Sequence, residues 1–353
     1  MRILFVCPTN PRFMPYLNNF LEVVGTDHEV ELIIWDRFND EKPDAGYIYR
    51  RGGARHQRGL LDYYMYGRFI RRHLKSHSYD RIICFGLQMA FFLRRELRET
   101  YSGRYIVDIR DYNKIAQFYD FEGLIKNSAL TVISSAGYKS WLPNFDRYFI
   151  NHNTLIKSLA DVRPIGNKRA LPVSISSIGA LRDLKINTDF IASVAGCSEI
   201  QLSFHGQGDI NSQLSAFVND GYSGVAITGY YPKEREPGLY MSADMINVFR
   251  YPDSLNNNTA LPNRLYSAPI FAKPLLAFKG TYLADLIEVH ELGLVVSSFH
   301  DVGCQILEYF ERFDPEAFDI SRRAFLSGVI HENDLFNREL LLFLERPQEL
   351  SCA

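Results

Sequence analysis

Short apolar runs rich in Val, Ile and Leu alternate along this chain with stretches whose apolar residues recur at helical spacing. Strands that alternate with helices in this way are typical of parallel sheets covered by helices on both faces. The predicted strands are Arg2–Pro8, Glu29–Trp35, Arg81–Phe85, Arg104–Ile109, Leu130–Ser134, Arg147–Asn151, Val173–Gly179, Ile200–His205, Val225–Gly229, Met245–Arg250, Pro274–Phe278 and Leu294–Ser297. The predicted helices are Met14–Val24, Leu60–Leu74, Met89–Glu99, Tyr112–Asn127, Gln305–Phe313 and Leu335–Leu344.

The strand and helix pattern restarts once, after a mixed segment at residues 155–171 that carries Pro, Gly and a basic cluster. We therefore expect an α/β fold of two doubly wound, Rossmann-like domains, residues 1–160 and 161–330, that face each other across a cleft. The last segment, residues 331–353, is expected to be a helix that packs back on the first domain. In such sheets ligands bind beyond the carboxyl ends of the strands, so the candidate chemistry belongs there.

Composition and charge narrow the class of protein. The 353 residues carry a formal net charge of −2. Residues 1–160 hold 23 Lys and Arg against 17 Asp and Glu, a net of +6, and the remainder hold 16 against 24, a net of −8. The five cysteines include no Cys-x-x-Cys pair, and no apolar run approaches the roughly 18 residues of a membrane-spanning helix. We expect a cytoplasmic protein with neither a disulfide framework nor a structural zinc site.

The positive charge of the first half gathers between Arg50 and Lys75. This segment has eight basic residues against the single acid Asp62, and Leu, Tyr, Met, Phe and Ile side chains lie between them. On a helix the two sets fall on adjoining faces, which fits a helix at an anionic membrane surface and equally a core helix with a solvated basic face. The chain as a whole is slightly acidic and has no recognisable nucleic-acid module, so we expect no nucleic-acid partner.

The usual nucleotide and metal motifs are absent from the sequence. The nearest match to Gly-x-Gly-x-x-Gly is Gly206-Gln207-Gly208, which has Asn211 in the place of the third glycine. We interpret it as a tight turn after a strand that lets the backbone approach a ligand. There is no P-loop and no Asp-x-Asp metal clamp, and the nine histidines do not cluster at ligand spacing. We expect no metal and no cofactor.

Two segments of the second half place groups that favour anions at predicted helix starts. Gly179, Arg182 and Lys185 follow a strand, where backbone N–H groups and the helix dipole already attract negative charge. The polar run from Asn256 precedes a helix expected to begin near Pro262, which is an N-cap pattern. Both helix starts are expected to point at one crevice.

In order along residues 172–300, the segments SIGALRDLK, SFHGQGD, AITGYYPKEREPGLYMSADMINVFR and NNNTALPNRLYSAPIFAKPLL resemble the donor domain of GT-B glycosyltransferases of the retaining family-four type, which build bacterial surface polysaccharides. In the first half, YIVDIRDY resembles the acceptor-domain segment that ends in an Arg-Asp pair. The resemblance implies metal-independent transfer of a hexosyl or related sugar from a UDP or GDP type donor to a lipid-linked or oligosaccharide acceptor, in capsule or O-antigen synthesis. With the basic segment, it places the protein at the inner face of a membrane.

The resemblance also implies roles for individual residues. Arg182 and Lys185 match the cations that neutralise the donor diphosphate and the departing nucleotide, and their double alanine variant is expected to lose transfer with its fold intact. Tyr230 and Tyr231 match the loop that lies against the base. The other donor-binding positions implied are Gly179, Gly206, Asn258, Thr259, Asn263, Arg264 and Ser267.

The chain departs from the family pattern at three positions of the donor loop. The family has two glutamates separated by seven residues, one for the donor sugar and one for the ribose hydroxyls, and Thr259 and Ser267 stand in their places. Pro262 also removes one amide from the phosphate cradle. The departures leave open a different mode of hydroxyl recognition, an unusual donor or reduced activity.

The acceptor side offers fewer candidates. The loop after the first strand carries no carboxylate or His base, which favours retention, with the leaving phosphate taking the acceptor proton. Asp111, beside Arg110, is the candidate for positioning the acceptor, or alternatively the N-cap of the helix predicted at Tyr112–Asn127. His56 and His152 are candidates to face the cleft, and His205 is expected to satisfy a backbone carbonyl.

Two other functions fit this architecture. A nucleotide-sugar epimerase shares it, but needs several acid and base groups in which this donor loop is poor. A non-catalytic, transferase-like partner subunit is compatible with the missing glutamates. Nucleotide binding and sugar isomerisation with donor alone distinguish the three.

Overall fold

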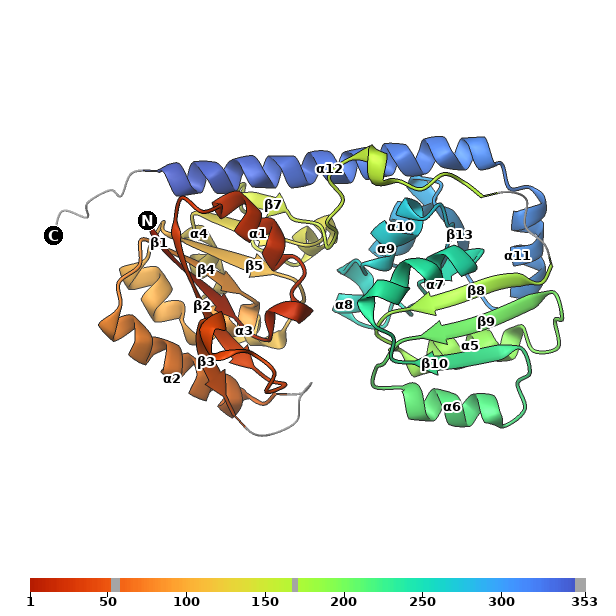
Figure 1. Cartoon of the computed structure of the whole chain (residues 1–353), viewed down its shortest axis with the longest axis horizontal. Helices are drawn as coiled ribbons and strands as arrows, with labels where there is room; N and C mark the ends of the chain where they lie inside the picture. Colours follow the sequence, from red (N-terminus) through yellow and green to blue (C-terminus); the bar gives the residue numbers. More distant parts are fainter. Residues whose placement is uncertain (52–57, 167–170, 347–353) are drawn as a thin grey trace. The chain divides into compact units, whose positions relative to one another are not determined.

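The structure is a computed structural model that describes residues 1–51, 58–166 and 171–346. It divides into two compact units, Met1–Leu155 with His331–Ala353 and Ile156–Ile330. Each unit contains one parallel sheet with helices packed against it (Figure 1). The prediction of an α/β protein with two Rossmann-like domains is confirmed.

The first unit is built on a seven-stranded sheet in the order β3-β2-β1-β4-β5-β6-β7. The strand order reverses between β1 and β4, so the loops after these strands flank a topological switch point. The strands are β1 (Arg2–Cys7), β2 (Glu29–Asp36), β3 (Tyr47–Arg50), β4 (Arg81–Phe85), β5 (Tyr105–Ile109), β6 (Leu130–Ile133) and β7 (Tyr148–Ile150). β3 escaped the sequence analysis because this short edge strand is only half-buried and lacks a continuous apolar run.

The helices of the first unit correct one prediction. The α-helices are α1 (Leu17–Val24), α2 (Leu60–Ser76), α3 (Leu87–Phe92) and α4 (Phe121–Lys126), followed along the chain by part of α12; η3 (Glu96–Thr100) is a π-helix, and η1 (Pro11–Phe13), η2 (Pro43–Ala45), η4 (Lys114–Phe118) and η5 (Ala136–Ser140) are 3-10 turns. The single helix predicted at Tyr112–Asn127 is wrong. Asn113 caps η4 by accepting from Ile115 N, and Asp120 caps α4 by accepting from Gly123 N, so two local caps divide the segment.

The second unit contains a six-stranded parallel sheet in the order β10-β9-β8-β11-β12-β13. Its strands are β8 (Val173–Ile178), β9 (Ile200–His205), β10 (Val225–Gly229), β11 (Met245–Asn247), β12 (Leu275–Phe278) and β13 (Gly293–Val296). Its helices are α5 (Leu184–Ser193), α6 (Asn211–Asn219), α7 (Glu236–Ser242), α8 (Leu255–Thr259), α9 (Arg264–Ile270), α10 (Tyr282–Val289) and α11 (Val302–Glu311), with 3-10 turns η6 (Leu159–Asp161) and η7 (Lys233–Arg235). All six strands predicted for this half are confirmed in place, with shorter bounds for β11.

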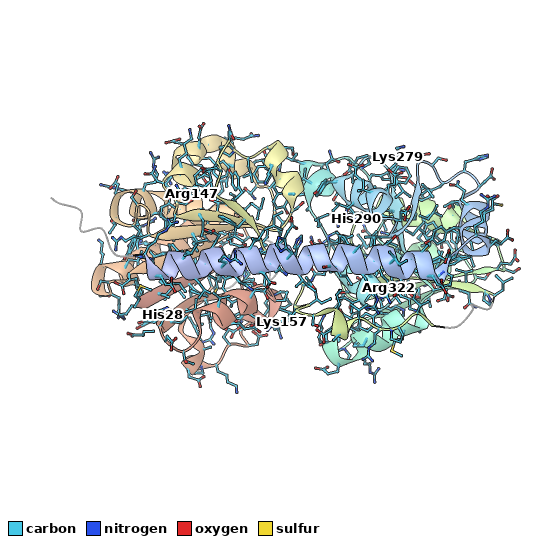
Figure 2. The ribbon with its side chains drawn as sticks, turned by 90° about the horizontal axis from the view of Figure 1, so that it is seen from above. His28, Arg147, Lys157, Lys279, His290 and Arg322 are labelled. Carbon is cyan, nitrogen blue, oxygen red and sulfur yellow. The ribbon has the colours of Figure 1, made fainter. Side chains whose placement is uncertain are left out.

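A long helix, α12 (Pro315–Glu345), contributes to the core of both units. In the second unit Phe325 and Leu326 join the core, and the buried guanidinium of Arg322 (labelled in Figure 2) donates to the carbonyls of Pro269 and Arg163. In the first unit Phe336 packs edge-on against Phe20, with ring centroids 4.9 Å apart.

The carboxyl end of α12 is capped from the first sheet. Arg81, at the start of β4, is 2% exposed and donates to the carbonyls of Phe343 and Arg346 at 3.3 and 2.5 Å. These are carbonyls that no helical N–H reaches, and a cation there also complements the helix dipole. Among the described residues, no helix combines the length and hydrophobicity required to span a membrane.

Candidate functional site

The carboxyl ends of the strands in the second unit carry most of the predicted donor-binding residues. The strand order of this sheet reverses between β8 and β11. The loops after these two strands, residues 179–183 and 248–263, therefore flank the switch point at which doubly wound sheets bind ligands.

Glycines pack the loop after β9 directly against the loop after β8. A Cβ atom at Gly206, where φ is +131°, would lie 1.8 Å from the carbonyl oxygen of Gly179, and one at Gly208 would lie 1.9 Å from that of Leu181. Asn211 braces the turn by donating to the Gly206 carbonyl and accepting from Gly208 N. Gly206 and Gly208 are thus required for close approach to the neighbouring loop, and approach of this turn to a ligand stays a prediction.

Two arginines meet at the switch point. Arg264 opens α9, and its guanidinium donates to the carbonyl of Asn247 in β11 at 2.7 Å. Arg250, which follows β11, donates to the carbonyl of Ala260 at 3.2 Å. Burial, followed by the positive charge of Arg250, lowers the pKa of Arg264 to about 10. Two guanidinium groups close together favour the binding of an anion, so this edge is a candidate anion site.

Arg182 and Lys185 lie at the same edge, Arg182 on the loop that enters α5 and Lys185 in the first turn of that helix. Lys185 forms an ion pair at 2.6 Å with Asp189 one turn later, and the Tyr251 hydroxyl donates to the same carboxylate at 2.6 Å. The bonds from Lys185 and Tyr251 lower the pKa of Asp189. Lys185 must therefore exchange Asp189 for a diphosphate in order to bind one, whereas Arg182 is exposed on its loop.

Asp183 connects this loop electrostatically to α9. It adopts the left-handed conformation, with φ of 59°, in which a non-glycine residue is strained. Its charge is one of those that act on Arg264. The loop after β8 and the start of α9 therefore lie close enough to act on one ligand.

The polar run before α9 differs from its predicted form. Residues 256–259 lie inside α8, which Ser254 caps by accepting from Asn257 N, so this run is not the N-cap of the next helix. Asn263 precedes α9 but makes no side-chain cap hydrogen bond, and it is exposed. The capping residue is Ser254, and the helix that it caps is α8, one helix earlier in the chain than predicted.

The residues that stand for the family glutamates are engaged within the protein. The Thr259 hydroxyl donates to the carbonyl of Leu255 at 2.6 Å. The Ser267 hydroxyl is bonded to the phenol of Tyr240, whose pKa burial raises to about 12. Directly before Thr259, Asn258 has a buried Oδ1 with no hydrogen-bond partner, which makes it a candidate acceptor for a ligand hydroxyl.

The two tyrosines after β10 have different surroundings. Tyr231 packs on the core and donates to Glu236 at 3.3 Å, and burial raises its pKa. Tyr230 is 75% exposed and available to stack on a planar group. The structure thus gathers Tyr231, Ser267 and Arg264 around Tyr240, which the sequence analysis missed together with Arg250. Arg250 had been assigned to the preceding strand, and Tyr240 has no signal beyond its place in an apolar run.

In the first unit, Arg110 and Asp111 have separate environments. Arg110 forms a buried bidentate ion pair with Asp108, at 2.5 and 2.6 Å, and also donates to Asn151. Asp111 is exposed just beyond β5. Since no helix starts at Tyr112, the alternative that Asp111 is an N-cap is wrong, and positioning of the acceptor stays a prediction.

The histidines proposed for the cleft have protein partners or lie outside the described residues. His152 Nε2 lies 2.6 Å from Glu332 of α12, and its bond lowers the pKa of that carboxylate. His205 Nδ1 lies 2.9 Å from the Thr228 hydroxyl, so its partner is a side chain and not the expected carbonyl. His56 lies outside the described residues. Within the described part of the chain, no group of three or more His, Cys, Asp or Glu side chains is arranged to hold a metal ion.

The basic segment at residues 50–75 divides into paired and exposed arginines. Arg50 bonds to Asp36 at 2.8 Å, and Arg51 to Asp62 at 3.1 Å. One face of α2 presents a continuous exposed set of apolar and cationic residues, namely Leu60, Leu61, Tyr64, Arg68, Arg72 and Lys75. We call this set the α2 exposed face. Arg55, also part of the predicted segment, lies outside the described residues.

These strands and switch-point loops, with the helix that follows them, form a known fold. It is the GT-B fold of glycosyltransferases. No protein-family model and no curated protein sequence matches the chain. Solved structures match over almost their whole length.

The lipopolysaccharide outer core galactosyltransferase WaaB is similar over 97% of this chain and 99% of its own, with 14% identity and a TM-score of 0.64. HepE from Anabaena, in complex with UDP and glucose, is similar over 96% of this chain and 99% of its own, with 14% identity and a TM-score of 0.65. Sucrose-phosphate synthase from Thermosynechococcus elongatus is similar over 98% and 97%, with 12% identity and a TM-score of 0.68. At these identities the likeness shows a shared fold.

Proposed function

We propose that this protein is a glycosyltransferase that takes its sugar from a nucleotide diphosphate donor. The observation that carries the proposal is the Arg264 guanidinium, buried beside Arg250 at the switch point of the second sheet. Two guanidinium groups at this edge complement the negative charge of a donor diphosphate. The UDP complexes of HepE support a nucleotide of the UDP type.

The chemistry needs charge stabilisation more than a general base. As the glycosidic bond to phosphate breaks, negative charge grows on the leaving diphosphate. Arg264, Arg250 and Arg182 lie where fixed positive charge stabilises it, and Lys185 joins them when it leaves Asp189. With retention, the departing phosphate takes the proton of the acceptor hydroxyl, and Asp111 positions the acceptor.

Recognition of the donor hydroxyls differs from that of the family-four pattern. The orphaned Oδ1 of Asn258 accepts from a sugar or ribose hydroxyl, and Thr259 and Ser267 present hydroxyls where the family presents carboxylates. Tyr230 stacks on the base. Each of these groups contributes weaker bonds than a carboxylate, so donor selection falls mainly on the diphosphate.

We further propose a lipid-linked or oligosaccharide acceptor of capsule or O-antigen type, reached at the cytoplasmic face of a membrane. The α2 exposed face supports this because it sets leucine and tyrosine beside three cations on one helix. Cations attract anionic lipid and the apolar residues enter the interface.

The test of the donor proposal is isothermal calorimetry with UDP, GDP and UDP-glucose on the full chain and on Arg264→Gln. Because charge-assisted hydrogen bonds are worth about 1.5–3 kcal/mol, we expect binding to weaken about tenfold or more. Arg312→Gln, at an exposed arginine that follows α11 and lies 3.9 Å from Glu308, is the matched control and should bind normally. Absence of nucleotide binding by the wild type overturns the proposal and favours the partner-subunit function.

Incubation with UDP-glucose separates transfer from epimerisation. A transferase leaves the donor sugar unchanged without acceptor and releases UDP when an acceptor glycan is added. An isomerised sugar formed from donor alone identifies a nucleotide-sugar epimerase instead.

A further inference from the structure

A second arginine pair lies at the carboxyl edge of the first sheet, around Trp35. The indole ring of Trp35 is fully buried near the end of β2. The guanidinium carbon of Arg37 lies 4.5 Å from the ring centroid, and that of Arg58, just before α2, lies 5.4 Å from it. Two cations thus share one aromatic surface.

These three side chains hold buried donors without partners. The orphaned atoms are Trp35 Nε1, Arg37 Nε, Arg58 Nε and Arg58 Nη2, four of the ten such side-chain atoms among the described residues. Tyr63 takes one bond from Arg37, at 3.0 Å. A cluster of unmet donors in one place implies an acceptor that the protein itself does not supply.

The nearby carboxylates are already committed to other cations. Asp36 binds Arg50 at 2.8 Å, and Asp62 binds Arg51 at 3.1 Å. Burial and the charge of Arg37 lower the pKa of Arg58, which agrees with an excess of positive charge here. Among the described residues, no carboxylate forms an ion pair with Arg37 or Arg58, although the charge of Asp62 acts on Arg58.

A purely structural arginine in this chain is built differently. Arg81 is more deeply buried than Arg37 and Arg58, and its Nε, Nη1 and Nη2 all donate to backbone carbonyls. The donors of Arg58 have no such carbonyls. Stacking on Trp35 orients the two guanidinium groups, and the carboxyl edge of a doubly wound sheet is where a ligand is expected.

We propose that Arg37, Arg58 and Trp35 form an anion site of the first domain that holds a phosphate or carboxylate group of the acceptor. The assignment to the acceptor rests on the proposed function, whereas the anion site itself does not. It commits the acceptor to an anionic glycan or glycolipid, because a neutral sugar would not compensate the charge of these two half-buried guanidinium groups.

Trp35 supplies a direct readout, since the chain has only two tryptophans. In a Trp141→Phe background, the emission of Trp35 is titrated with sodium phosphate and with glucuronate at constant ionic strength. We expect a saturable change with at least one probe, and the probe that binds more tightly distinguishes a phosphorylated acceptor from a uronic acid. Arg58→Gln should weaken binding about tenfold, as loss of about 1.4 kcal/mol would.

The control is Arg95→Gln, an arginine whose side chain is 81% exposed and which pairs with Glu99 outside the cluster. Thermal unfolding excludes a merely structural role. Removing Arg58 relieves a buried like-charge contact, so its Tm should not fall, whereas loss of a structural arginine lowers it.

Three results would overturn the site: no saturable emission change, equal binding by Arg58→Gln, or a fall in Tm that accounts for the weaker binding. UDP calorimetry on the same samples keeps the two proposals apart. If the chain binds phosphate near Trp35 but binds no nucleotide, the anion site is supported and the proposed transferase function is overturned. If it binds nucleotide but no phosphate near Trp35, the transferase function is supported and the anion site is overturned.

Discussion

Lys185 and Asp189 already form an ion pair at the carboxyl edge of the second sheet, where we propose that the donor binds. Asp189 holds the ammonium of Lys185 at 2.6 Å and thereby competes with the diphosphate for it. We predict that Asp189→Asn, which can still accept from Tyr251, tightens UDP binding about two- to fivefold, because an exposed pair of this kind is worth up to about 1 kcal/mol. Calorimetry measures the change, and weaker binding would show that Asp189 serves the ligand.

The residue roles that can be predicted from a sequence are limited, because they depend on what each side chain contacts in three dimensions. The positions of Arg182, Lys185 and Arg264 follow from strand ends and helix starts, which hydrophobic periodicity reveals. The competition of Asp189 for Lys185, and the bond between Ser267 and Tyr240, join side chains that no spacing rule connects.

At the scale of elements, α12 is held in the first unit by one apolar face. Phe336 is fully buried against Phe20, and its neighbour Leu335 is 39% exposed. We predict that Phe336→Ala lowers the free energy of unfolding by about 3–5 kcal/mol through the cavity it leaves. Leu335→Ala is the matched control and should change it by less than about 1 kcal/mol, within the range of surface substitutions. Urea denaturation followed by circular dichroism measures both.

A second prediction at the scale of elements concerns membrane binding by the α2 exposed face. Changing Arg68, Arg72 and Lys75 to Gln should weaken binding to vesicles containing phosphatidylglycerol, by about 1 kcal/mol for each charge at low salt. Rising salt should weaken binding of the wild type more than that of the variant, because salt screens exposed charges. Sedimentation with vesicles measures the bound fraction. If vesicle binding depends neither on lipid charge nor on salt, the membrane role is wrong and α2 is an ordinary helix with a solvated face.

Elements are easier to predict than their ends. Long apolar strands such as β1 and β8 are buried on both faces and produce an unbroken signal. β3 and the caps at Asn113 and Asp120 are decided by local hydrogen bonds and by one neighbouring strand. Hydrophobic periodicity does not reveal such contacts. For this reason β3 was not predicted, and a single helix was wrongly predicted across the caps at Asn113 and Asp120.

For the whole molecule, two buried histidines set the response to mild acid. His73 of α2 stacks on His77 with centroids 4.1 Å apart and bonds to Tyr79, with Glu31, Arg2 and Tyr47 around it. Burial, then the charge of His77, lowers the pKa of His73 below the usual 6.5, and burial lowers that of His205. Each histidine is thus neutral in the folded chain at a pH where the unfolded chain already binds a proton.

Stability should therefore fall as the pH drops below about 6.5, because the unfolded state then binds more protons than the folded state. Carboxylates such as Glu31 and Asp36, whose pKa values bonding partners lower, contribute only at more acidic pH. We predict that His73→Gln flattens the loss of unfolding free energy between pH 7.5 and 5.5, although its stability at pH 7.5 is lower without the bond to Tyr79. His300→Gln, whose side chain is 87% exposed, should keep the wild-type slope. Equal slopes for wild type and His73→Gln in urea titrations across this range would assign the acid sensitivity to other groups.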